Sequence, residues 1–94
     1  MGWVQVPRVS ALYGIVIAIY PGEGHHAGRP HFHAEYAESA ATFDIETFEV
    51  IAGRLPRRAT RLVTKWAEIH QPDLRANWQR ARDHETLVPI DPLP

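Results

Sequence analysis

Apolar side chains recur at every second position in three successive runs that together span residues 31–52. A period of two is typical of a β-strand with one buried face, because successive side chains of a strand point to opposite sides of the sheet. The runs place these residues on one face: Phe32, Ala34 and Tyr36, then Ala41, Phe43 and Ile45, then Phe48, Val50 and Ala52. Three such runs in succession predict an antiparallel meander.

The strand register follows from keeping the apolar residues together, because a one-residue slip would turn them to the other face. A two-residue turn at Glu38-Ser39 predicts these cross-strand pairs: Tyr36 with Ala41, Ala34 with Phe43, Phe32 with Ile45, His33 with Asp44, and Glu35 with Thr42. A second turn at Glu46-Thr47 pairs Ile45 with Phe48 and Phe43 with Val50. Neither turn carries the Asn-Gly or Asp-Gly signature of a tight hairpin.

Elements before and after the meander complete the expected fold. The run Leu12–Tyr20 is apolar on both faces, which predicts a central strand covered on both sides. After Pro56, which suits the first turn of a helix, apolar residues recur at helical spacing: Ala59, Leu62, Val63, Trp66 and Ile69. Pro72 ends this helix and begins a second one, whose apolar side carries Leu74, Trp78 and Ala81.

This order of strands and then helices predicts an α+β fold, with an antiparallel meander sheet of about four strands followed by two helices packed on one face. We expect one domain over residues 1–94. Its expected parts are a leader (1–6), the β meander (7–53), a helical pair (54–84) and an extended tail rich in proline (85–94).

The composition excludes several classes of protein. Without cysteine the chain has no disulfide, no thiolate zinc site and no cysteine nucleophile, and it suits a reducing cytosol. Its longest apolar run is shorter than the roughly 20 residues needed to cross a bilayer. The 10 basic residues are balanced by 11 acidic ones, so the chain as a whole is not a polycation. We therefore expect a cytoplasmic protein without membrane contact.

Histidines supply the most chemically suggestive motif. His31 and His33 stand two residues apart on a predicted strand, so both imidazoles project from one face, and Glu35 continues that face. Two imidazoles and a carboxylate suit a divalent metal such as zinc, with His31, His33 and Glu35 as the candidate ligands. Because imidazole titrates near neutral pH, His31, His33 and Asp44 are also candidates for general acid–base catalysis.

A simpler interpretation of the same residues is an ordinary solvated sheet face, on which polar side chains alternate with buried apolar ones. His-x-His is a weak metal motif without a third ligand at a fixed spacing. Two further histidines, His25 and His26, lie in the glycine- and proline-rich loop before the strand. Nothing in their spacing assigns them a role.

Basic residues form the second candidate site. Arg57, Arg58, Arg61 and Lys65 crowd the start and the outer face of the first predicted helix, whereas the acidic residues lie mainly on the strands. Such a row is able to bind the phosphates of a nucleic acid, despite a net charge of −1 for the whole chain. The alternative is a helix face that simply contacts water.

Four segments also carry a family resemblance: Pro7-Arg8-Val9-Ser10, Tyr13-Gly14-Ile15-Val16-Ile17, Pro30-His31-Phe32-His33-Ala34-Glu35-Tyr36 and Leu55-Pro56-Arg57-Arg58-Ala59. On these motifs the chain resembles the small prokaryotic proteins grouped as domain of unknown function 4160, over residues 7–93. The His25-His26 loop departs from the usual family pattern, whereas His31 and His33 match it.

The resemblance implies a component of a toxin–antitoxin-like module, because members are frequently encoded beside another small protein. Such a component would act through a small protein partner or through self-association, using the apolar first strand or the tail, and through nucleic-acid binding by the arginine-rich helices. The alternative is a small metal-dependent or histidine-based enzyme, such as a nuclease. The resemblance transfers no catalytic residue to this chain.

Overall fold

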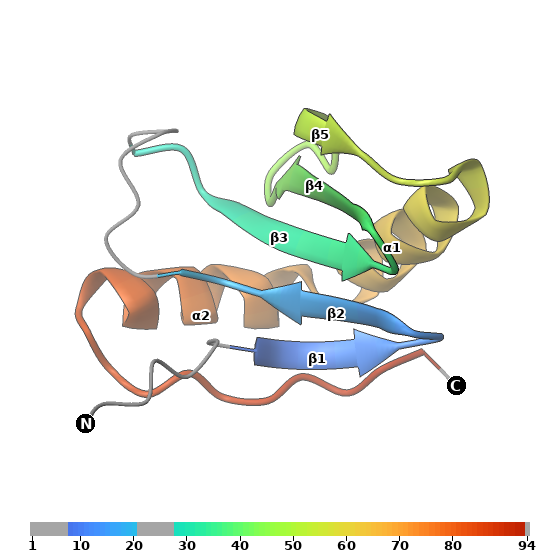
Figure 1. Cartoon of the computed structure of the whole chain (residues 1–94). Coiled ribbons are helices and arrows are strands. Elements are labelled where there is room, and N and C mark those ends of the chain that lie inside the picture. The colour runs from blue at the N-terminus through green and yellow to red at the C-terminus, as the bar shows by residue number, and fades with distance from the viewer. Residues whose placement is uncertain (1–7, 21–27, 94) are drawn as a thin grey trace, which may run out of the picture.

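A computed structural model describes residues 8–20 and 28–93 (Figure 1). Within these residues the elements are β1 (Arg8–Leu12), β2 (Ile15–Ala18), β3 (His31–Tyr36), β4 (Ser39–Asp44), β5 (Val50–Arg54), α1 (Arg57–Ile69) and α2 (Gln71–Arg82). The five strands form one antiparallel sheet in chain order, and Figure 1 shows both helices behind one face of it. The predicted α+β meander is confirmed, with one strand more than the four or so predicted.

The additional strand is β1, which lies almost wholly before the run Leu12–Tyr20. The sequence predicted that run as a single strand, but it supplies β2 and only the last residue of β1. The chain instead reverses at Tyr13-Gly14, so that β1 and β2 form a hairpin. Tyr13 and Gly14 both have positive φ angles, 48° and 80°. Two successive left-handed residues match the twist of a tight hairpin, and glycine accepts that conformation without steric cost.

The register between β3 and β4 differs from the predicted one by two residues. The turn lies at Ala37-Glu38, one residue earlier than expected, and Ala34 therefore pairs with Ala41 rather than with Phe43. A slip of two residues leaves every side chain on its original face. The core face was predicted correctly, but the cross-strand partners were wrong.

Between β4 and β5 the predicted pair of Phe43 with Val50 is confirmed. The predicted pair of Ile45 with Phe48 is not formed, because β4 ends at Asp44 and Phe48 has a positive φ of 66°. Val50 is 40% exposed, although the alternation placed it on the core face. The last run of the meander thus contributes less to the core than its pattern indicated.

Gly53 shapes the end of β5. A bulge between Thr42 and Phe43 shifts the register, and Gly53 then has a φ of 73°. A Cβ atom at this position would lie 2.3 Å from the backbone oxygen of Ala40. Only glycine allows β5 to approach β4 this closely, next to the pair that Arg54 forms with Ala40 at the end of the strand.

The core lies between the sheet and the two helices. At its centre the rings of Phe32 and Phe43 stack with centroids 5.2 Å apart, and Trp66 of α1 packs edge-on against Phe32 at 5.9 Å. All three side chains are fully buried. Such aromatic pairs contribute about 0.5–1.5 kcal/mol beyond the burial of their area. In the part of the chain that the structure describes, no helix is long and apolar enough to span a membrane.

The segment after α2 returns along the outer edge of β1, as Figure 1 shows at the lower side of the sheet. The backbone N–H of Ile90 donates to the carbonyl of Val9 at 2.7 Å. The indole N–H of Trp66 donates to the carbonyl of Asp91 at 2.8 Å. The first bond covers part of the open edge of β1, and the second ties the same segment to α1.

Asn77 of α2 fixes the same segment from the other side. Its fully buried amide donates to the carbonyl of Val88 and accepts from the N–H of Val88, each at 2.8 Å. The Asn77 amide thus satisfies both backbone groups of Val88, as a neighbouring strand would do in a sheet. The expected extended tail is therefore anchored to the fold near Val88.

Candidate functional site

The predicted His-x-His motif lies at the start of β3. The ring centroids of His31 and His33 are 5.3 Å apart, with the ring planes at 79°. The indole of Trp78 lies 4.9 Å beyond His31, and the ring of Tyr20 lies 5.0 Å from His33. The four rings form one continuous row, in which His31 is only 1% exposed and packs as an aromatic side chain.

The polar atoms of the two imidazoles have local partners. Nδ1 of His31 lies 2.7 Å from the carbonyl oxygen of Arg29, so that nitrogen carries the proton and donates it. Nδ1 of His33 lies 3.2 Å from the hydroxyl of Thr42. The predicted pairing of His33 with Asp44 is wrong, because the two-residue slip places Thr42 opposite His33 and Asp44 opposite His31.

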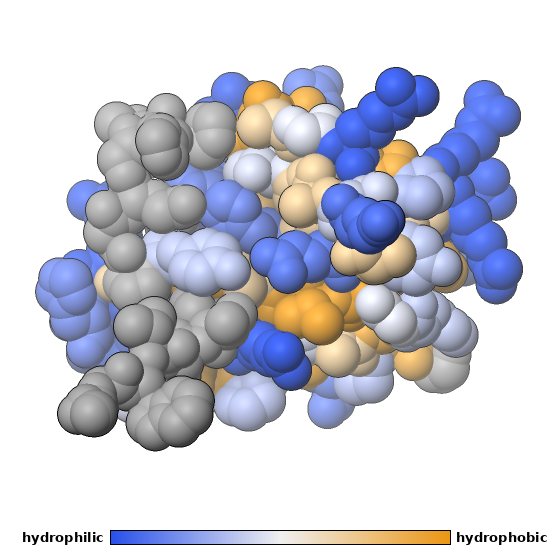
Figure 2. All heavy atoms as spheres, in the orientation of Figure 1, coloured by the Kyte–Doolittle hydropathy of each residue, from blue (hydrophilic) through white to orange (hydrophobic). Residues whose placement is uncertain are grey.

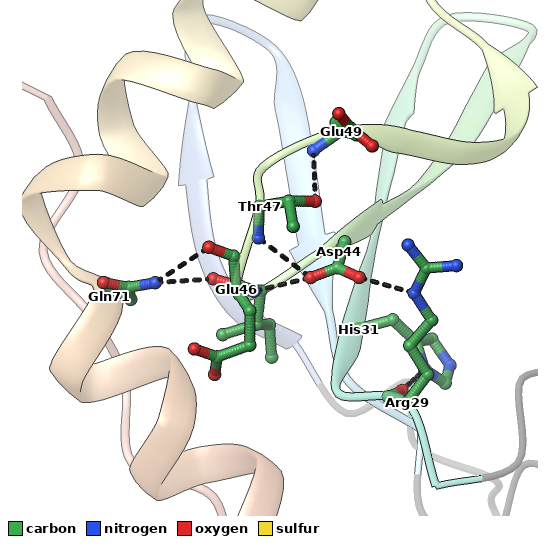
Figure 3. Close-up of polar contacts among 8 residues, drawn as sticks. Arg29, His31, Asp44, Glu46, Thr47, Glu49 and Gln71 are labelled. Carbon is green, nitrogen blue, oxygen red and sulfur yellow. Dashed lines mark hydrogen bonds and ion pairs between the residues drawn. The ribbon is translucent and has the colours of Figure 1, made fainter.

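The carboxylate of Asp44 is occupied on both oxygens (Figure 3). Oδ1 accepts from the backbone N–H groups of Glu46 and Thr47, at 2.6 and 2.9 Å, and Oδ2 accepts from the guanidinium of Arg29. Burial alone would raise the pKa of Asp44, but the hydrogen bonds from Arg29, Thr47 and Glu46 hold this pKa below its usual value. Asp44 therefore shapes the turn that follows β4.

The same turn is tied to α2. The side-chain amide of Gln71 donates to the carbonyl of Ile45 at 2.9 Å. Figure 3 shows Gln71 reaching from the helix toward the turn at Glu46. Arg75 forms a two-point ion pair with Glu46, at 2.6 and 3.0 Å, and its hydrogen bond lowers the pKa of Glu46. The polar side chains at this end of the sheet thus bind one another or the backbone.

The third predicted metal ligand, Glu35, is exposed and lies opposite Ala40, not Thr42 as predicted. Among the described residues, no three His, Asp or Glu side chains come together as a metal-binding group. His25 and His26 lie outside those residues. The metal-binding and catalytic roles of the His-x-His motif stay predictions.

A pocket opens at the opposite end of β3. It has a volume of about 310 Å³ and is lined by Tyr13, Ile15, Tyr36, Pro56, Arg58, Ala59 and Leu62. Tyr13 and Tyr36 are 56% and 38% exposed, although both rings are large and partly apolar. The ring of Tyr36 packs beside Gly14, with its Cε1 3.5 Å from where a Cβ would be, which is an ordinary van der Waals distance.

Five cationic side chains stand beside this pocket, and we call them the α1 cationic surface: Arg54, Arg57, Arg58, Arg61 and Lys65. All five are exposed, and α1 has no acidic residue in its first turn. The ion pairs within the described residues join other groups: Arg29 with Asp44, His70 with Asp73, and Arg75 with Glu46. No described acidic side chain forms an ion pair with a member of the α1 cationic surface.

Helix geometry places the cations and the pocket next to each other. Arg57, Arg61 and Lys65 follow at intervals of four residues, which makes a row about 12 Å long on one side of α1. Arg58 and Leu62 form the neighbouring row and line the pocket. A second, more open hollow shares Pro56 with the pocket and is lined by Arg54 and Arg57, together with one acidic residue, Glu38. Figure 2 shows strongly hydrophilic side chains projecting over β5 and the start of α1.

The family model described as Domain of unknown function (DUF4160) matches residues 14–79, well over half of the 94-residue chain. The chain belongs to the DUF4160 family. Neither a curated protein nor a solved structure matches it. In this DUF4160 chain the match runs from the β1–β2 turn into α2, so it includes Tyr36 and the whole α1 cationic surface, whereas β1 and the tail lie outside it.

Sequence reasoning missed the pocket of this DUF4160 domain. Tyr13 lay inside an apolar run that predicted a buried strand, and Tyr36 belonged to the core-facing alternation. The available signal was Gly14, because an isolated glycine inside a strand pattern indicates an interruption of the regular strand. The arginines of α1 were identified from their helical spacing, and the structure leaves all of them exposed.

Proposed function

We propose that this DUF4160 protein is a binding protein that contacts the phosphates of a nucleic acid through the α1 cationic surface. The observation that carries the proposal is a group of five exposed cations on adjacent elements, none of which forms an ion pair with a described residue. Exposed Lys and Arg side chains bind phosphates and release condensed counterions, which supplies most of the free energy of non-specific binding.

The local distribution of charge supports this proposal, whereas the net charge of the whole chain does not. The net charge is −1, so attraction to a polyanion depends on local clustering. Two of the acidic side chains, Asp44 and Glu46, are engaged by Arg29 and Arg75 at the far end of the sheet. Four of the five cations are arginines, whose planar guanidinium groups bind phosphate oxygens at two points.

The cellular setting is a further part of the proposal. The family resemblance supports a role in a toxin–antitoxin-like module, in which the protein acts with a small protein partner, and the absence of cysteine suits the cytosol. Co-purification with the product of the neighbouring gene tests this part. A chain that stays alone when both proteins are expressed together would contradict it, without affecting the nucleic-acid proposal.

Fluorescence anisotropy with labelled oligonucleotides tests the binding itself. We expect the double variant Arg57→Ala/Arg61→Ala to bind about tenfold more weakly than the wild type, and the slope of log affinity against log salt to fall by about 0.7–0.9 for each lost phosphate contact. The matched control is Arg8→Ala/Arg82→Ala, which removes the same charge from β1 and α2. Equal losses in both double variants would mean that only total charge matters, and the proposed surface would be wrong.

A further inference from the structure

We infer that the pocket between Tyr13, Tyr36 and Arg58 holds one unpaired nucleobase, so that the bound nucleic acid is single-stranded. This inference rests on the proposed function and specifies the class of nucleic acid. It depends on three separate observations: the exposed rings at the pocket, the size of the pocket, and its position against the α1 cationic surface.

The first observation is the exposure of two aromatic rings around an apolar floor. Tyr13 and Tyr36 come from different hairpins, and both stay substantially exposed. Beneath them lie Ile15 and Ala59, which are nearly fully buried and belong to the core. A rigid floor under accessible rings suits a flat, partly apolar group, because a nucleobase offers a π face on which any aromatic side chain can stack.

The second observation is size. A volume of about 310 Å³ lies at the lower end of the range for pockets that bind small organic groups, roughly 300–1,000 Å³. One base fits such a space, whereas a base pair inside a duplex is stacked on both sides and cannot enter it. Recognition of bases in this manner therefore requires a single strand or a loop whose bases turn outward.

The third observation selects a nucleic acid over an apolar peptide. Arg58 lines the pocket itself. Arg57 and Arg54 lie in the hollow on the other side of Pro56, where the two arginines outnumber the one acidic residue, Glu38. A base seated between the tyrosines would have a phosphate on each side of its sugar, and cations flank the pocket to receive them. An apolar peptide carries no regular row of negative charge, so it would fill the pocket without binding the neighbouring cations. The cations therefore favour a nucleic acid.

The experiment compares affinities for single-stranded RNA, single-stranded DNA and a duplex, each of about 12 nucleotides. We expect the wild type to bind a single strand at least about tenfold more tightly than the duplex, which corresponds to one stacked base. Tyr36→Leu keeps an apolar side chain without a ring and should remove this preference, while Tyr36→Phe should retain it. Binding to the duplex should be the same in all three proteins.

A second measurement uses only the wild type, so that it does not depend on the folding of a variant. Single-stranded RNA containing 4-thiouridine is cross-linked by ultraviolet light, and the modified residues are mapped by mass spectrometry. Cross-links at Tyr13 or Tyr36 support the inference. If single-stranded DNA binds as tightly as RNA, the pocket reads the base and not the sugar, which also agrees with it.

The remaining outcomes overturn either this inference or the proposed function. Equal affinity for single strand and duplex, or a preference that Tyr36→Leu leaves unchanged, excludes the base pocket while the phosphate surface stands. Binding to no nucleic acid overturns the proposed function itself. Cross-links confined to α1 would show that the strand contacts the cations and bypasses the pocket.

Discussion

The two ends of β3 use polar side chains in opposite ways. At the His31 end, Asp44 binds two backbone N–H groups and Arg29, and the imidazole of His31 is buried against Trp78. At the Tyr36 end, the cations have no described ionic partner and the rings are exposed. The comparison teaches that chemically rich residue types do not by themselves mark a binding surface. In our proposal, exposed cations that form no ion pair with a described residue are the better guide to a binding surface.

The largest expected effect concerns the backbone that supports the Tyr36 end. Gly53→Ala places a methyl group 2.3 Å from the oxygen of Ala40, and we expect unfolding to become easier by about 3 kcal/mol or more. Gly28→Ala is the control, because Gly28 has a similar φ of 76° but no atom within 4 Å of the added carbon. Urea denaturation of both variants separates the clash from the backbone strain. Equal losses would mean that strain alone governs Gly53.

The next effect concerns the His31 end. Asp44→Ala leaves the backbone N–H groups of Glu46 and Thr47 without their charged acceptor and removes the partner of Arg29, so we expect a loss of about 2–3 kcal/mol. Asp73→Ala breaks an exposed pair with His70 and should cost at most about 1 kcal/mol. Denaturation midpoints at constant pH measure both changes. Similar small losses would show that Asp44 is not a structural residue.

A pH series sharpens the same point. The pKa of Asp44 is lower in the folded protein than its ordinary value of 3.8. Its ionised form therefore contributes stability that is complete above the ordinary pKa and is lost as the pH falls through the lower folded pKa. We expect the stability advantage of wild type over Asp44→Asn to shrink in denaturation curves taken from about pH 7 down to about pH 3. A constant advantage across this range would contradict the charged role.

The smallest effect tests whether the Tyr36 end is arranged for binding at the expense of stability. Arg58 stands in the first turn of α1, where the helix dipole disfavours a cation, so Arg58→Glu should stabilise the protein by about 0.3–1 kcal/mol while weakening nucleic-acid binding. Arg82→Glu, in the last turn of α2, should destabilise it by a similar amount. Thermal denaturation compares the two. A loss of stability in both variants would argue that Arg58 has a structural contact.

Much of the fold could be predicted because period two and period 3.6 are direct consequences of strand and helix geometry. The partners across β3 and β4 could not, because the register depends on the turn. Ala37 adopts a positive φ of 53° in this turn, and alanine is not a residue type that predicts such a conformation. A slip of two residues keeps the faces intact, so the apolar pattern cannot detect it.

The candidate site likewise has one part that the sequence predicted and one part that it did not. The arginines of α1 lie on one helix, so their spacing alone places them on a common outer face. The pocket is built from the β1–β2 turn, the end of β3 and the start of α1, and only the folded chain brings these three segments together. A site assembled from distant segments leaves no local pattern in the sequence.

The pairing of Ile90 with Val9 has a consequence for synthesis and folding. β1 is the earliest of the described strands to leave the ribosome, yet the segment that covers its edge follows every described strand and helix. Until Val88–Asp91 have been made, that edge stays available to any other chain, and closing it requires a contact of long sequence separation, which slows folding. The nascent chain therefore passes through a period in which it is vulnerable to aggregation or to capture by a chaperone, and this period ends only when the tail docks.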